Sequence, residues 1–130
     1  MVLESRTQKG RHGECLASAF LEDRGHRILE RNWRWGKAEV DLISTDGCHV
    51  VFHEVKLRTG CDQFHNPEAW HPRAGQRRRI ARAAHQYMRL RKWEGLGWRF
   101  DVLLVCLTQS DGGWAHRIRW HPEAFFPEPT

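Results

Sequence analysis

The stretch HVVFHEVKLR, residues 49–58, decides how this chain is interpreted, because an apolar strand gives way to charged side chains without losing its pattern. Side chains alternate across a strand, so the face that begins with Val50 and Phe52 ends with two charged residues. These are Glu54 and Lys56, which a strand separates by about 6 to 7 Å. The stretch therefore predicts a core strand that carries a polar site at its end.

The preceding segment, AEVDLIS at residues 38–44, alternates in the same way and predicts a second strand. Its two acidic residues, Glu39 and Asp41, are expected to share one face with Ile43. Asp46-Gly47 is a typical turn signal between two such strands. The two segments are therefore expected to form a β-hairpin.

A two-residue turn at Asp46-Gly47 sets the pairing of this hairpin. It predicts Glu39 directly opposite Glu54, with Asp41 as a diagonal neighbour on the same face. Like charges that face each other across strands destabilise a sheet unless a positive charge lies between them. A Mg²⁺ ion bound through one or two carboxylates would resolve the conflict. The alternative is a solvated acidic face with Lys56 as its salt-bridge partner.

The rest of the sequence places this hairpin in an α/β sandwich with a mixed sheet flanked by helices. The run WRFDVLLVCLT is almost continuously apolar, as expected of a strand that is buried on both faces. The predicted elements are a helix at 13–24, strands at 26–35, 38–44 and 49–58, a loop at 59–72, a helix at 73–92, and strands at 98–108 and 114–120. Residues 121–130 are expected to be a tail.

Length and composition limit the remaining choices. At 130 residues the chain fits one domain, with a core from about residue 9 to 120. No apolar run approaches the roughly 20 residues that cross a bilayer, and the first residues lack the apolar stretch of a secretory signal. A cytoplasmic protein without a membrane partner is therefore expected. Its four cysteines, which form no CxxC pair, are expected to be free thiols.

Each predicted helix carries one polar residue at the inner end of its apolar stripe. Glu14 shares the stripe of Ala17 and Leu21 in the first helix, and Gln76 heads the stripe of the second. Taken alone, Glu14 could simply interact favourably with the helix dipole, and Gln76 could simply be a polar residue near a helix start. Both are nevertheless expected to point inward.

Together these segments resemble the YraN-type family of small uncharacterised bacterial proteins. The resemblance rests on residues 10–14 (GRHGE), 39–43 (EVDLI), 54–56 (EVK), the basic helix and 100–102 (FDV). That family looks like part of the PD-(D/E)XK, or restriction-endonuclease-like, superfamily and is similar to archaeal Holliday junction resolvases. The resemblance implies a three-layer sandwich whose mixed five-stranded sheet follows the order α-β-β-β-α-β-β.

Carried over by position, the resemblance implies a phosphodiester hydrolase with Mg²⁺ or Mn²⁺ as cofactor. Asp41 and Glu54 would ligate the metal, with the backbone carbonyl of Val55 as a further ligand. Lys56 would orient the attacking water or stabilise charge on the phosphate, and Glu14 would be an auxiliary acid. Two more residues are auxiliary candidates beside the site: Glu39 and Gln76.

The net charge of +5 favours a polyanionic partner, and the positive residues are concentrated on the second predicted helix. Eight Arg and Lys residues, and no acid, lie between positions 73 and 92. The alternative is a solvated helix face, which would normally mix in acids. The candidates for nucleic-acid binding are Arg11, Arg58, Arg73, Arg77, Arg78 and Trp70, with Trp70 considered for stacking on an unpaired base.

These features favour a metal-dependent nuclease-like protein that acts on DNA, with branched and single-stranded DNA among the candidate substrates. One alternative is a catalytically silent nucleic-acid-binding or adaptor module with the same fold, and another is a protein-interaction domain that binds no divalent metal. The intact Asp41, Glu54 and Lys56 favour the enzyme. Similar resolvases act as symmetric dimers because two strands must be cut. A homodimer is therefore one of the oligomeric states that the sequence leaves open.

Overall fold

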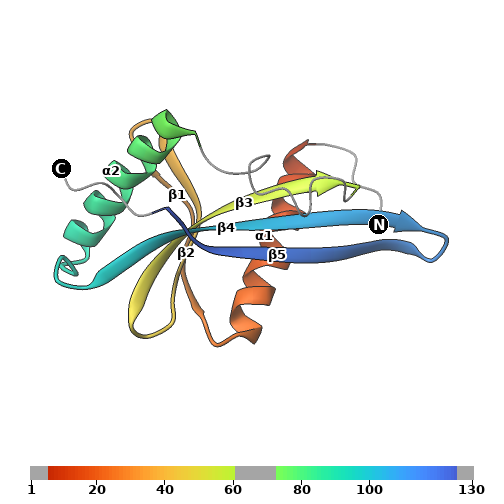
Figure 1. Cartoon of the computed structure of the whole chain (residues 1–130), viewed down its shortest axis with the longest axis horizontal. Helices are drawn as coiled ribbons and strands as arrows, with labels where there is room; N and C mark the ends of the chain where they lie inside the picture. Colours follow the sequence, from red (N-terminus) through yellow and green to blue (C-terminus); the bar gives the residue numbers. More distant parts are fainter. Residues whose placement is uncertain (1–5, 61–72, 126–130) are drawn as a thin grey trace.

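The described chain forms one β-sheet with a helix against each of its faces (Figure 1). The computed structural model describes residues 6–60 and 73–125. In chain order the elements are α1 (Arg6–Asp23), β1 (Arg27–Trp35), β2 (Ala38–Thr45), β3 (His49–Thr59), α2 (Ala74–Leu90), β4 (Gly97–Ser110) and β5 (Gly113–Phe125).

The five strands lie in the order β1-β2-β3-β4-β5. β3 and β4 run parallel, and the other neighbouring pairs are antiparallel. A parallel pair needs a long crossover connection, and α2 lies in it. The predicted element order and mixed five-stranded sheet are thus confirmed.

Two apolar clusters, one on each face of the sheet, hold the helices in place. In the α2-side core, Leu104 of β4 packs with Ile80 and Tyr87 of α2. In the α1-side core, the next residue towards the N-terminus, Leu103, packs with Leu21 of α1. Successive residues of a strand point to opposite faces, so the continuous apolar run of β4 is explained by burial on both sides. The fold is therefore a three-layer α/β sandwich.

Some element boundaries differ from those expected. α1 begins at Arg6 rather than at residue 13. The sequence did not predict these first turns, because the polar segment before Gly13 has no apolar stripe. β5 continues to Phe125, so residues 121–125 belong to the sheet rather than to a tail. Pro122 is tolerated there because β5 is an edge strand. The expected loop lies outside the described residues from position 61 to 72.

The β2–β3 hairpin has a different register from the expected one. Thr45 pairs with Val50, so the turn contains four residues rather than the two at Asp46-Gly47. The Asp46 carboxylate holds the wider turn by accepting hydrogen bonds from the backbone N–H groups of Cys48 and His49, both at 2.8 Å. The pairing of the two strands is consequently shifted by two residues from the prediction.

The cysteine expectation is correct only in part. Cys15 and Cys48 are free and exposed. Cys106 is disulfide-bonded, so the expectation that all four cysteines are free thiols is wrong. As to membranes, neither described helix is both long and apolar enough to cross one.

Candidate functional site

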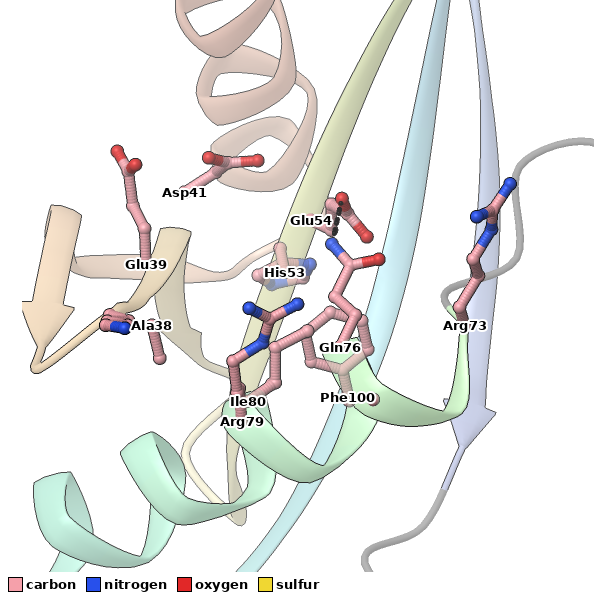
Figure 2. A pocket seen from close by; sticks show the side chains of 12 residues that line it. Ala38, Glu39, Asp41, His53, Glu54, Arg73, Gln76, Arg79, Ile80 and Phe100 are labelled. Carbon is pink, nitrogen blue, oxygen red and sulfur yellow. Dashed lines mark hydrogen bonds between the residues drawn. The ribbon is translucent and has the colours of Figure 1, made fainter.

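Glu54 is held from two sides near the middle of β3 (Figure 2). Its Oε1 atom accepts a hydrogen bond of 2.9 Å from the Gln76 side chain of α2 and lies 3.5 Å from the Lys56 ammonium. Its Oε2 atom is buried and has no hydrogen-bond partner among the described residues. A buried carboxylate oxygen without a partner is costly. This atom therefore marks a position where a cation or a hydrogen-bond donor from a ligand would be stabilised.

Asp41 lies at the fork where β2 and β3 separate. Regular pairing of these strands ends next to it, and its Oδ2 atom instead accepts a hydrogen bond of 2.8 Å from the Val55 N–H group. In the observed register Asp41, rather than Glu39, corresponds to Glu54. The prediction that Glu39 lies directly opposite Glu54 is therefore wrong, because the four-residue turn shifts the strands.

The alternation of side chains also changes phase at Asp41. Val40 and Ile43 both belong to the α2-side core, whereas Leu42 belongs to the α1-side core. Strict alternation would have placed Val40 and Leu42 on the same face. The prediction that Glu39, Asp41 and Ile43 share one face is thus wrong, because the backbone changes phase between Val40 and Leu42.

In β1 the regular strand backbone is interrupted at Asn32, across from the change of phase in β2. Asn32 has a left-handed backbone, with φ of 52°, and lies across from Asp41 between the regular pairs of the β1–β2 ladder. Asn tolerates this conformation better than most non-glycine residues. Its Nδ2 group donates a hydrogen bond of 3.1 Å to the Glu14 Oε2 atom of α1. Asn32 thus interrupts the regular backbone of β1 and binds Glu14 at the same position.

Asp41 does not have the pKa of an ordinary carboxyl group. Burial is the main cause that raises its pKa to about 7, against the opposing effect of the Val55 hydrogen bond. The negative charges of Glu14, Glu54 and Glu39 raise the pKa further. Three acidic residues therefore act on Asp41, and a bound cation would relieve this repulsion.

A cleft of about 570 Å³ opens over these carboxylates, between the β2–β3 fork and α2 (Figure 2). Its charged lining is balanced, with three acids facing three cations. The acids are Glu39, Asp41 and Glu54, and the cations are Lys37, Arg73 and Arg79. None of the ion pairs among the described residues joins Arg73 or Arg79 to a cleft carboxylate. These guanidinium groups are thus available to a negatively charged ligand.

The first turn of α2 faces the same cleft. Gly75 and Gln76 line it, and the Arg73 side chain makes no capping hydrogen bond to the helix. The N-terminal N–H groups of a helix carry partial positive charge and favour anions. In Figure 2 the Arg79 and Gln76 side chains both rise from this helix toward β3.

His53 lines the cleft but carries no positive charge. Its side chain is fully buried, and burial lowers its pKa to about 3. One ring nitrogen, Nε2, lies 2.7 Å from the Ser44 hydroxyl group, which is also 2.9 Å from His26. This histidine is therefore a neutral part of the core.

The other residues predicted from the sequence are distributed around this site. Lys56 contacts Glu54, Glu14 influences Asp41, and Glu39 pairs with Arg34 at 3.5 Å. Four of the predicted nucleic-acid contacts do not line the cleft: Arg11, Arg58, Arg77 and Arg78. Trp70 lies outside the described residues.

Three residues of the site were not singled out from the sequence. Arg79 is one of the eight basic residues predicted for the second helix, but it was not assigned to the site. It follows Gln76 by three positions, so helical spacing could have placed it on the same face. Lys37 enters the cleft only because the β1–β2 turn lies at its edge, and nothing in the sequence pattern indicates this. Asn32 is one of the residue types that adopt left-handed backbone, but its position opposite Asp41 depends on strand pairing.

Two substitutions test whether the left-handed backbone of Asn32 matters for stability. Asn32→Gly keeps a residue that accepts positive φ, so it should change the free energy of unfolding by less than about 1 kcal/mol. Asn32→Val forces a β-branched residue into the same conformation and should cost about 2 kcal/mol or more. Urea unfolding of both variants measures the difference.

Arg34→Val is the matched control, because Arg34 lies in the same strand and is exposed, and its φ is not positive. It loses only an exposed ion pair, so its effect should stay below about 1 kcal/mol. Equal losses in Asn32→Gly and Asn32→Val would show that the left-handed conformation is not what matters at this position.

The donor set is suited to a hard divalent cation. Mg²⁺ prefers carboxylate and carbonyl oxygens and keeps several waters, so one or two carboxylates are sufficient. Within the described ranges, no group of three acidic, histidine or cysteine side chains is close enough to form a complete metal cage. The two candidate ligands are therefore Asp41, with its raised pKa, and Glu54, with its unpartnered oxygen.

The sheet and its two helices define an α/β-sandwich protein with a charged cleft at the fork of a β-hairpin. The chain belongs to the uncharacterised protein family UPF0102, whose family model matches residues 13–105. A UPF0102 protein of Anaeromyxobacter dehalogenans is 40% identical over 122 residues, which cover 94% of this chain and 87% of the relative. One of Moorella thermoacetica is 36% identical over 107 residues, which cover 82% and 88%.

Among solved structures, the chain is similar to SfsA of Pyrococcus furiosus, determined in complex with Ca²⁺. The TM-score is 0.41 and the sequence identity is 14%. The match covers 94% of this chain, which spans 64% of the length of that protein.

Proposed function

We propose that this chain is a metal-dependent nuclease of the PD-(D/E)XK type that hydrolyses phosphodiester bonds in DNA. The observation that carries the proposal is the unpartnered Oε2 atom of Glu54, beside Asp41, in a cleft that also contains available guanidinium groups. Metal ligands and phosphate-binding cations are thereby combined in one site. Phosphodiester hydrolysis needs both.

The metal would be held by Asp41 and Glu54, with the Val55 carbonyl as a further ligand. A Mg²⁺ or Mn²⁺ ion bound there would polarise a phosphate oxygen and lower the pKa of a bound water. Gln76 and Lys56 orient the Glu54 carboxylate through its Oε1 atom. Its Oε2 atom is therefore left to bind the metal.

The remaining groups would act on the phosphate and the water. The Lys56 ammonium would stabilise negative charge that develops on the phosphate, as a fixed donor beside Glu54. Arg73, at the N-cap of α2, and Arg79 within the helix would bind the phosphate, together with the first turn of that helix. Glu14, held by Asn32, would serve as an auxiliary acid next to Asp41.

DNA is the proposed substrate because the positive charge continues beyond the cleft along α2. Arg78, Arg82 and Arg89 are exposed, and this helix contains no acidic residue. Such a surface contacts phosphates without reading sequence, and its affinity falls as salt concentration rises. A cytoplasmic location and a homodimer that cuts two strands accompany this proposal as further predictions.

A substrate panel tests the proposal. The purified protein is incubated with linear duplex, flapped, four-way and single-stranded DNA in Mg²⁺, in Mn²⁺ and in EDTA. Cleavage of at least one substrate is expected in a divalent cation and not in EDTA. If no substrate is cut under any of these conditions, the nuclease proposal fails.

The catalytically silent module is the second candidate, and the basic face of α2 is the observation in its favour. It predicts salt-dependent DNA binding without cleavage. A protein-interaction domain predicts neither DNA binding nor uptake of a divalent cation. Titration of Mg²⁺ into the parent and into Glu54→Gln separates these cases, because only a real metal site loses affinity in the variant.

A further inference from the structure

Trp35 is an exposed aromatic residue at the tip of the β1–β2 hairpin. It retains 46% of its accessible surface, although large aromatic side chains gain strongly from burial. Its neighbour Gly36 adopts a left-handed backbone, with φ of 59°, which lets the chain turn tightly into Lys37. The fold therefore leaves this large aromatic side chain at the surface.

Strand pairing places Trp35 on the same face of the sheet as the cleft. It pairs with Ala38, and side chains of directly paired residues lie on the same face. Ala38 lines the cleft and contributes to the α2-side core. Two residues earlier on this face, Trp33 packs its ring against Tyr87 of α2, with ring centroids 5.2 Å apart. The inner aromatic residue is thus packed, whereas the outer one lies exposed beside the cleft.

The positive charges that line the adjoining cleft suit a nucleic-acid strand. Lys37 follows Trp35 by two residues and lines the cleft, as do Arg73, which is the N-cap residue of α2, and Arg79 within that helix. An aromatic ring beside cations that bind phosphates is the arrangement that proteins use for single strands. Bases within a duplex are stacked on each other, so their faces cannot reach a protein side chain.

We infer that Trp35 is a stacking platform for an unpaired base, and that the substrate therefore presents unpaired nucleotides to the cleft. This inference rests on the proposed function, because it assumes a nucleic-acid ligand. The base stacks on the Trp35 indole, while the adjoining phosphate contacts Lys37 and the α2 arginines. The substrate class is single-stranded DNA, or a junction or flap with an unpaired segment.

Binding measurements in EDTA test this without any cleavage. Three labelled probes with equal numbers of phosphates are used: a short oligothymidylate, a strand of abasic sites and a hairpin duplex. Trp35→Ala should weaken oligothymidylate binding by about tenfold, because stacking on an aromatic side chain contributes about 1–3 kcal/mol per base. Trp35→Phe should retain part of the affinity. Binding of the abasic and duplex probes should hardly change.

Leu96→Ala is the matched control, because Leu96 is 49% exposed and is not a lining residue of the cleft. It should leave all three affinities unchanged. An unchanged affinity of Trp35→Ala for oligothymidylate overturns the inference and points instead to a protein partner for this apolar tip. An equal loss on all three probes overturns it as well, because stacking cannot act on an abasic strand.

The two proposals can fail separately. If no substrate is cut but oligothymidylate binding still depends on Trp35, the stacking site stands and the nuclease assignment fails. If a single strand is cut by Trp35→Ala with unchanged kcat and KM, the nuclease stands and the stacking site fails. Urea unfolding of Trp35→Ala checks that the variant remains folded, and Trp35→Phe provides the test if it does not.

Discussion

Glu54→Gln is expected to lower the rate of DNA cleavage by on the order of a thousand-fold, the largest effect of any single substitution proposed for this chain. The variant keeps the shape of the side chain, and its amide oxygen can still accept the hydrogen bond from Gln76. What it removes is the negative charge of the unpartnered Oε2 atom. Without that charge the site should bind Mg²⁺ poorly, so binding of the metal and cleavage should fall together.

DNA binding by Glu54→Gln in EDTA should equal or exceed that of the parent, because one negative charge has left a cleft that binds phosphates. This contrast separates loss of chemistry from loss of folding. Glu22→Gln is the matched control, since Glu22 is an exposed carboxylate on α1 that does not line the cleft. Cleavage by Glu54→Gln at the parental rate would show that the metal is held elsewhere.

Asp41→Asn is expected to make the metal-free protein more stable at pH 8 while abolishing its response to Mg²⁺. The pKa of Asp41 is about 7 in the folded chain, against about 3.9 for an unfolded aspartate. Keeping this group ionised in the fold therefore carries a free-energy penalty. The asparagine variant does not, and its amide oxygen can still accept the hydrogen bond from Val55.

The pH dependence follows from the same shift. Between about pH 4 and pH 7 the unfolded chain has released the Asp41 proton while the folded chain retains it. The free energy of unfolding of the parent therefore falls as pH rises through this window. Above about pH 7, Asp41 no longer makes the free energy of unfolding depend on pH. At pH 8 in EDTA the variant should exceed the parent by on the order of 2–4 kcal/mol, and below pH 4 the two should converge.

Urea unfolding at several pH values measures this difference directly. Asp111→Asn is the control, because Asp111 is an exposed turn residue and should not alter the pH profile. Saturating Mg²⁺ should raise the stability of the parent and leave that of Asp41→Asn unchanged. A variant that is less stable than the parent at pH 8, or that responds to Mg²⁺ as the parent does, would contradict the proposed role of Asp41.

Local sequence patterns were sufficient to predict where most elements lie, because each element must bury at least one face. The alternation in β2 and β3 and the apolar run in β4 predict strands. These patterns respond to burial alone and do not depend on which strands become neighbours. They do not reveal the first turns of α1, which begins at Arg6, because those residues have no apolar stripe.

The hairpin pairing could not be obtained in the same way. Asp-Gly is a strong signal for a two-residue turn, yet here the Asp46 side chain binds two backbone N–H groups and stabilises a four-residue turn. Asp41 nevertheless remained near Glu54, because the two-residue shift moves Asp41 from a diagonal position to the one across from Glu54.

The sequence by itself determined the α/β class, the family, and which acids and basic residues are candidates for the site, because residue type and spacing carry that information. Only the tertiary structure decided that Asp41 sits at the fork of β2 and β3, that Asn32 holds Glu14 beside it, and that one oxygen of Glu54 lacks a partner. The reason is that each of these depends on contacts between residues far apart in the chain. Burial, which raises the pKa of Asp41 to about 7, exists only once the sheet and helices have assembled around it.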